Sequence, residues 1–156
     1  MDQAITKSEL RERLRKARRA HAQSQPDTIR ALLFNHPPRP LVCKIASDTV
    51  IGLYHATPYE APAGGYARFF KEAGHRIALP LFADKDAPMF FAEHTDPFGE
   101  TDLEPGPFGQ LQPNRDAETL VPDILFVPLV GCTASGKRLG QGGGHYDKWL
   151  AEHPAG

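Results

Sequence analysis

The sequence has few cysteines, no long apolar run and almost no net charge. Its two cysteines, Cys43 and Cys132, stand far apart and make no disulfide framework, which is typical of proteins in a reducing compartment. No apolar run approaches the length of a membrane span, and the N-terminus is charged rather than signal-like. We therefore predict a cytoplasmic protein with no membrane partner.

The charge is small but unevenly placed along the 156 residues. Residues 7–19 hold seven Lys or Arg and two Glu, a net charge of +5, so the remainder carries −6. A basic segment can meet nucleic acid or the phosphates of a small ligand. The chain is slightly acidic overall and its aromatic residues are not interleaved with the basic ones, which argues against a nucleic-acid partner. The length predicts one domain over residues 1–156.

The basic segment is predicted to be a helix. Thr6 and Glu9 match a capping box, in which each side chain bonds the other residue's backbone N–H. An apolar stripe follows at helical spacing, and Lys7 and Arg11 stand one turn apart beside it, so both should point along the protein body. The other basic side chains are predicted to be solvated: Arg13, Arg15, Lys16, Arg18 and Arg19.

Helical and strand patterns alternate along the rest of the chain, which favours an α/β fold with a mixed or parallel sheet. The predicted helices cover Pro26–Phe34, Tyr66–Ala73 and Tyr146–Glu152, and the predicted strands cover Thr49–Tyr54, Arg76–Phe82, Pro88–Ala92 and Asp123–Leu129. Glu93–Pro122 is rich in Pro, Gly and acid, and we expect it to be a long surface connection. Loops at the carboxyl ends of strands bind ligands in open α/β sheets, so Glu60, in the loop after Tyr54, is a candidate anchor.

The most informative stretch is residues 127–150. It holds four glycines in five positions: Gly140, Gly142, Gly143 and Gly144. Glycine lets backbone N–H groups approach an anion, and the preceding Lys137 and Arg138 add positive charge. Asp147, beyond the glycines, is a carboxylate suited to magnesium. Strand, basic turn, glycine loop and helix together indicate phosphate binding.

Two well-known phosphate loops do not fit this stretch. Residues 131–137 have the P-loop spacing, but Arg138 stands where a P-loop needs Ser or Thr, and the glycines that follow cannot begin a helix. The dinucleotide fingerprint needs Gly or Ala where the chain has His145.

A third pattern fits better. Residues 137–147 (KRLGQGGGHYD), which follow a strand-like run, resemble the Arg-Leu-Gly, glycine-rich turn and Tyr-Tyr-Asp of the 5-formyltetrahydrofolate cyclo-ligase family. The N-terminal Lys7-Ser-Glu-Leu-Arg11 is similar to that family's opening motif. Residues 54–60, with the helix, Gly74 and residues 77–80 that follow, are similar to its central segment. The resemblance covers nearly the whole chain.

The resemblance implies a three-layer α/β/α single domain with a mixed, largely parallel sheet. It also implies a ring closure that depends on ATP and magnesium, in which 5-formyltetrahydrofolate becomes 5,10-methenyltetrahydrofolate with release of ADP and phosphate. The formyl oxygen would first be phosphorylated to an imidate. Charge would develop on phosphoryl oxygens, so backbone amides and the fixed cations Lys137 and Arg138 would supply the catalytic stabilisation. We expect a monomer that binds these two small molecules.

The resemblance also assigns ligands to residues. ATP would be bound by Lys7, Arg11, Arg138, Leu139, Gly140, Gln141, Gly142, Gly143, Gly144, His145 and Tyr146. The folate would be bound by His55, Glu60, Gln141, Gly142, Gly143, Gly144 and His145. Asp147 would be a magnesium ligand. As a carboxylate at a helix N-terminus, Asp147 would also be favoured by the helix dipole.

Three features depart from the family pattern. His145 stands where the family usually has Tyr, and Cys132-Thr133 replaces a common Phe-Asp. The chain is also expected to lack the family's C-terminal strands and a second magnesium-binding aspartate. These departures leave an alternative function open, a non-catalytic protein that binds ATP or folate.

Overall fold

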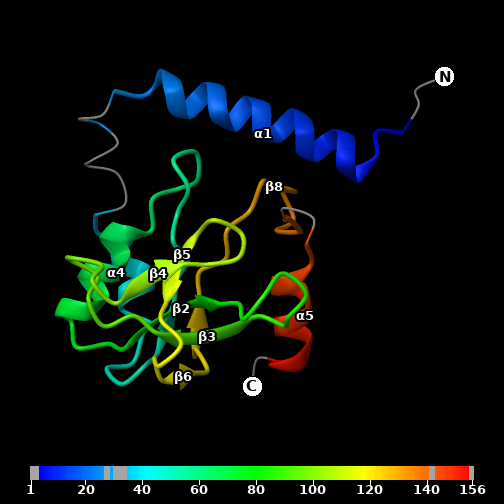
Figure 1. Ribbon diagram of the computed structural model, residues 1–156. Coiled ribbons are helices and arrows are strands. Elements are labelled where there is room, and N and C mark those ends of the chain that lie inside the picture. Colours follow the sequence, from blue (N-terminus) through cyan, green and yellow to red (C-terminus); the bar gives the residue numbers. More distant parts are fainter. Residues whose placement is uncertain (1–3, 27–28, 30–34, 141–142, 155–156) are drawn as a thin grey trace.

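The computed structural model describes residues 4–26, 29, 35–140 and 143–154, whose arrangement is drawn in Figure 1. Its helices are α1 (Lys7–Ser24), α3 (Arg39–Val42), α4 (Gly64–Glu72) and α5 (His145–Glu152). Its strands are β1 (Ile51–Gly52), β2 (Ile77–Leu81), β3 (Phe90–Glu93), β4 (Leu103–Pro105), β5 (Leu111–Pro113), β6 (Thr119–Leu120), β7 (Ile124–Leu125), β8 (Gly131–Cys132) and β9 (Arg138–Leu139). Within these residues, no helix is both long enough and apolar enough to cross a membrane.

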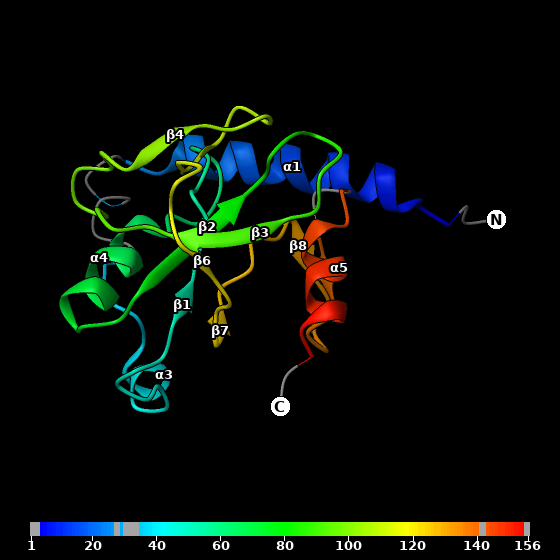
Figure 2. The same ribbon diagram turned by 60° about the horizontal axis from the view of Figure 1, so that its bottom comes forward.

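Helix α1 begins where the sequence predicts. The Thr6 hydroxyl accepts a hydrogen bond from the Glu9 N–H at 3.1 Å, and the Glu9 carboxylate accepts one from the Thr6 N–H at 3.0 Å, which confirms the capping box. No residue of α1 is buried, and Figures 1 and 2 show the helix lying along one side of the rest of the fold. The start of α1 is therefore determined by local hydrogen bonds rather than by burial.

The main sheet has the strand order β6-β3-β2-β1-β7. Strand β1 is parallel to β2 and β7, with Ile51 opposite Ile77 and Ile124, whereas β2–β3 and β3–β6 are antiparallel pairs. The predicted mixed sheet is confirmed, and its parallel part consists of β2, β1 and β7. Because parallel strands end at the same edge of a sheet, the loops that follow β1 and β7 lie at one edge.

Helices cover both faces of this sheet. Alternate residues of a strand point to opposite faces, so Ile77 and Leu79 pack with Phe70 of α4, whereas Ala78 packs in a second cluster with Trp149 of α5. Figures 1 and 2 show α4 and α5 on opposite sides of the strands. The predicted three-layer arrangement is therefore confirmed.

Two predicted segments differ from the structure. Of the strand predicted over Asp123–Leu129, only β7 forms, and the later part of the range contains Pro128, which has no N–H to donate to a strand ladder. The predicted surface connection Glu93–Pro122 contains the β4–β5 hairpin and the edge strand β6. The Gln112 side chain in this hairpin is buried and bonds both backbone groups of Phe82, at 3.1 Å and 3.0 Å. Such side chain–backbone bonds are invisible in a hydrophobic pattern.

The other predicted elements are present with changed ends. The helices predicted over Tyr66–Ala73 and Tyr146–Glu152 and the strands predicted over Arg76–Phe82 and Pro88–Ala92 are shifted by one or two residues. The strand predicted over Thr49–Tyr54 pairs only at β1. The helix predicted over Pro26–Phe34 falls mostly outside the described residues.

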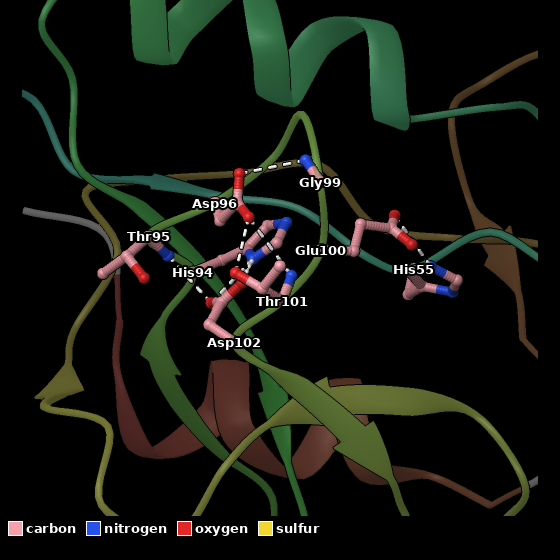
Figure 3. Close-up of polar contacts among 8 residues, drawn as sticks. All are labelled: His55, His94, Thr95, Asp96, Gly99, Glu100, Thr101 and Asp102. Carbon is pink, nitrogen blue, oxygen red and sulfur yellow. Dashed lines mark hydrogen bonds and ion pairs between the residues drawn. The ribbon is translucent and has the colours of Figure 1, made fainter.

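The loop between β3 and β4 is organised by two aspartates, which Figure 3 shows. The Asp102 carboxylate lies 2.9 Å from Nδ1 of the buried His94. The Asp96 carboxylate accepts hydrogen bonds from the Thr101 hydroxyl at 2.6 Å and the Gly99 N–H at 2.9 Å. These bonds, that of the Thr101 hydroxyl foremost, lower the pKa of Asp96 from 3.8 to about 2.

We expect the Asp96→Asn variant to lose thermal stability less steeply in acid than the wild type. Ionised Asp96 stabilises the fold above its ordinary pKa of 3.8, and this contribution is lost as the pH falls through the folded-state pKa of about 2. The measurement is Tm between pH 5 and pH 2. Asp116→Asn, at an exposed turn, is the matched control. Equal slopes for Asp96→Asn and the wild type would contradict this assignment.

Candidate active site

The glycine-rich stretch runs from a short hairpin towards helix α5. Strands β8 and β9 pair antiparallel, and the turn between them is closed by a hydrogen bond from the Thr133 N–H to the Lys137 carbonyl at 2.9 Å. A P-loop would open directly into a helix, so this turn agrees with the exclusion of that motif. Helix α5 begins only after Gly144, whose φ of 71° strongly favours glycine.

Helix α1 carries the N-terminal motif to the glycine-rich stretch. Arg11 donates a hydrogen bond from Nε to the carbonyl of Gly140 at 2.9 Å. One turn later, Leu14 packs where a Cβ on Gly131 would lie only 2.5 Å from it, so the glycine makes room for this contact. Arg11 thus reaches the predicted site. Lys7 is exposed at the start of α1 and lines none of the cavities described below.

Arg138 on β9 is held by three groups. Its Nη1 donates to the Pro128 carbonyl at 3.1 Å, its Nη2 donates to the Asp147 carboxylate at 3.1 Å, and its guanidinium lies 5.6 Å from the centre of the Tyr146 ring. The Arg138 side chain is only 19% exposed, so its charge acts on a neighbouring anion with less screening by water. Lys137, in contrast, is exposed and does not line the cavity around Arg138.

These residues surround a cavity of about 200 Å³, here called the glycine-loop cavity. It is lined by Arg11, Phe82, Pro128, Arg138, Gly140, Gly143, Gly144, His145, Tyr146 and Asp147. The N-terminal and glycine-rich motifs therefore meet in one space, where two guanidinium groups and a glycine-rich backbone suit a polyphosphate. Leu139 lies half-buried on β9, while Gln141 and Gly142 lie outside the described residues.

Three rings beside the glycine-loop cavity form an aromatic cluster. The ring centroids of Phe82 and Phe108 are 5.1 Å apart, and those rings lie 4.9 Å and 5.6 Å from the ring of His145. Phe82 is buried directly after β2, whereas Phe108, in the turn between β4 and β5, is 50% exposed. The sequence did not reveal Phe82 and Phe108 as site residues; the position of Phe82 at a strand's carboxyl end was the only available signal.

A larger cavity of about 490 Å³, here called the Arg18 cavity, lies between α1 and the loops after β1 and β7. It is lined by Arg18, His21, Ala22, Gln25, Tyr54, Tyr59, Glu60, Ala61, Pro62, Val127, Pro128, Leu129 and Val130. The predicted anchor Glu60 is among them, and its carboxylate accepts a hydrogen bond from the Thr57 N–H at 2.9 Å. Pro128 lines both this cavity and the glycine-loop cavity, so the two adjoin.

The charge of Glu60 acts on a tyrosine in each of the two cavities. Burial, and after it the Glu60 carboxylate, raises the pKa of Tyr54 to about 12. The same two causes, in the same order, raise the pKa of Tyr146. Both phenols therefore stay protonated and can donate hydrogen bonds; the Tyr54 hydroxyl donates one to the Ala61 carbonyl at 2.7 Å.

His55 lines neither of these two cavities. Figure 3 shows it directed at Glu100, with 3.1 Å between His55 Nε2 and the Glu100 carboxylate. Glu100 has a φ of 55°, a left-handed conformation that non-glycine residues seldom adopt. Both residues line a third cavity of about 190 Å³ together with His94, and this cavity shares Tyr54 and Pro62 with the Arg18 cavity. The structure therefore does not bring His55 together with the residues that the resemblance assigns to ATP.

The predicted magnesium ligand Asp147 lies at the start of α5. Its side chain is 77% exposed, lines the glycine-loop cavity and pairs with Arg138. Across the described residues, no three His, Cys, Asp or Glu side chains gather as a metal-binding group. Magnesium at nucleotide sites commonly takes one or two protein carboxylates and completes its shell with phosphates and water, so a single aspartate beside the predicted phosphate site fits.

The mixed sheet and this cationic, glycine-rich cleft define an α/β protein with a candidate polyphosphate site beside aromatic rings. The sequence profile of the 5-formyltetrahydrofolate cyclo-ligase family matches residues 3–156, so the chain belongs to that family.

Individual relatives agree with this membership. The 5-formyltetrahydrofolate cyclo-ligase of Haemophilus influenzae is 40% identical over 55 residues, which are 33% of this chain and 29% of that protein. The 5,10-methenyltetrahydrofolate synthetase of Aquifex aeolicus is 23% identical, with a TM-score of 0.68 over 94% of this chain and 74% of that one. The synthetase of Mycoplasma pneumoniae is 20% identical, with a TM-score of 0.61 over 92% and 79%. These two structures support the fold.

Proposed function

We propose that the protein catalyses the ATP-dependent cyclisation of 5-formyltetrahydrofolate to 5,10-methenyltetrahydrofolate, with release of ADP and phosphate. The observation that carries this proposal is the meeting of Arg11 and Arg138 with the glycine-rich backbone in one cavity, next to an aromatic cluster. A polyphosphate and a flat heterocycle can therefore be held in contact. Membership of the cyclo-ligase family agrees with this pair of substrates.

In this proposal the phosphates of ATP lie against Arg11 and Arg138, with backbone N–H groups of the glycine stretch around them. Arg138 is preorganised by Pro128 and Asp147, so it meets the developing charge without first rearranging. The further ATP contacts proposed from the family pattern are Lys7 and residues 139–146. Lys137 is also proposed as a catalytic cation, but as an exposed residue it would act on the phosphates through its charge alone.

The folate is proposed to place its pterin rings at Phe82, Phe108 and His145, where T-shaped and stacked arrangements of rings are favourable. Glu60 lines the neighbouring Arg18 cavity, its charge raises the pKa of both Tyr54 and Tyr146, and its carboxylate can accept hydrogen bonds from the folate. Gln141 to His145 would contact both substrates. His55 is proposed to contact the folate from the third cavity, at the beginning of the loop that also carries Glu60.

For this reaction the protein must position the formyl group of the folate against the terminal phosphate of ATP and stabilise the charge on the phosphoryl oxygens. The formyl oxygen attacks the terminal phosphorus of ATP, the bond to ADP breaks, and a phosphorylated imidate results. N10 of the folate then attacks the formyl carbon, the carbon–oxygen bond to phosphate breaks, and the proton of N10 leaves with the phosphate as the ring closes. Arg11 and Arg138 would stabilise the phosphoryl oxygens during both steps. Magnesium held by Asp147 and the phosphates, when bound, would neutralise part of the same charge.

Incubation of the protein with 5-formyltetrahydrofolate and Mg-ATP should raise the absorbance of the methenyl product and release phosphate in equal amount. Omission of ATP or of the folate should abolish both signals, because neither half of the reaction proceeds alone. No product at any protein concentration would overturn the proposal. In that case, calorimetric binding of ATP or folate would select the alternative, a binding protein without turnover.

A further inference from the structure

Arg18 does not lie on the solvated face predicted for it. Its side chain reaches from α1 into the Arg18 cavity, and its Nε and Nη1 atoms are buried without a hydrogen-bond partner in the described part of the chain. The nearby carboxylate of Glu60 is bonded to the Thr57 N–H through Oε1 and makes no ion pair with Arg18 among the described residues. Arg18 thus lines the cavity and carries two buried donors for which the described residues supply no acceptor.

A buried guanidinium with unpaired donors is stabilised by binding an anion. Arginine stays protonated in proteins, and a buried charged donor without a partner costs free energy. Its planar fork of N–H groups matches the two oxygens of a carboxylate or phosphate. Polar groups of this kind, left unpaired when a cavity is empty, mark the place where a ligand supplies the missing acceptor.

The walls of the Arg18 cavity indicate what else that ligand carries. The cavity's polar lining residues are Arg18, His21, Gln25 and Glu60, and the rest of the wall is apolar or aromatic, as at Tyr54, Tyr59 and Leu129. Such walls offer few hydrogen-bond donors to a polyphosphate. The cations suited to a polyphosphate, Arg11 and Arg138, line the glycine-loop cavity instead. A nucleobase carries no negative charge for Arg18. A flat apolar group that ends in a carboxylate satisfies both the walls and the guanidinium.

The proposed folate substrate contains such a group, because a benzoyl ring and a glutamate follow its pterin rings. We propose that Arg18 binds a carboxylate of the glutamyl tail of the folate and thereby makes the protein specific for the tailed substrate. Pro128 lines both cavities, so the aromatic cluster and Arg18 lie in neighbouring cavities, as one elongated ligand that contacts both would require. This inference rests on the proposed function.

The test compares Arg18→Leu with the wild type on 5-formyltetrahydrofolate and on an analogue in which a neutral methylamide replaces the glutamate. Loss of a charge-assisted hydrogen bond should raise KM for the tailed substrate by roughly 10-fold to 100-fold. KM for ATP should be unchanged, and KM for the amide analogue should be nearly the same in both proteins. Arg18→Lys should restore part of the difference, because it keeps the charge but loses the fork.

Arg13→Leu is the matched control, since Arg13 is an exposed arginine of the same helix and lines neither cavity. An Arg18→Leu variant that raises KM for ATP, or that affects both folates equally, or that has no effect, would overturn the inference. Calorimetry of the same folates separates this result from the proposed function. Arg18-dependent binding of the tailed folate without turnover would uphold the inference while the proposed activity fails; absence of folate binding to the wild type would overturn both.

Discussion

Replacing Arg138 with alanine should lower kcat/KM for ATP by roughly 10²-fold to 10³-fold, the range observed when one preorganised donor to a developing oxyanion is removed. The physical reason is the position of its guanidinium, which is mostly shielded from water and held by the Pro128 carbonyl and the Asp147 carboxylate. A cation fixed in this way stabilises charge on phosphoryl oxygens without reorganising. The affinity for folate should change much less.

Lys137→Ala provides the comparison for this prediction. The two cations are neighbours in sequence, but Lys137 is exposed and does not line the glycine-loop cavity. Steady-state kinetics with ATP varied at saturating folate, and the reverse, should therefore show a small effect for Lys137→Ala and a large one for Arg138→Ala. Equal losses in the two variants, or an unchanged ATP dependence for Arg138→Ala, would contradict the role assigned to Arg138.

Replacing Phe108 with alanine should raise KM for the folate by roughly 5-fold to 150-fold, since stacking of a base-like ring on an aromatic side chain contributes about 1–3 kcal/mol. Phe108 is half exposed, so its removal leaves the core intact, but its ring packs edge-on against Phe82 and His145. Loss of the ring opens the cluster on the side from which a pterin can enter. KM for ATP should stay close to the wild-type value.

Phe98→Ala is the matched control for Phe108→Ala. Phe98 is 59% exposed, against 50% for Phe108, and makes no contact with the aromatic cluster. The two variants should have similar Tm values, and only Phe108→Ala should bind folate more weakly by calorimetry. A loss of folate affinity in Phe98→Ala as large as that in Phe108→Ala would show that the cluster has no special role.

The sequence by itself determined the elements that depend on nearby residues. The Thr6–Glu9 capping box placed the start of α1, and alternating patterns located α4, α5, β2 and β3 within one or two residues. The residue types around the glycines indicated an anion site and excluded a P-loop through Arg138. These features could be predicted because caps, helical periodicity and turn chemistry act over a few positions in the chain.

Only the tertiary structure decided which side chains share a cavity. Arg11 meets the carbonyl of Gly140 across 129 positions of sequence, and Phe108 reaches His145 from a hairpin that the sequence pattern had suggested was an irregular connection. Arg13 and Arg18 belong to the same basic run, yet of these two residues only Arg18 lines the cavity. The reason is that strand pairing and helix docking bring distant segments together, and a local pattern of charge or hydrophobicity does not specify the partner of each face.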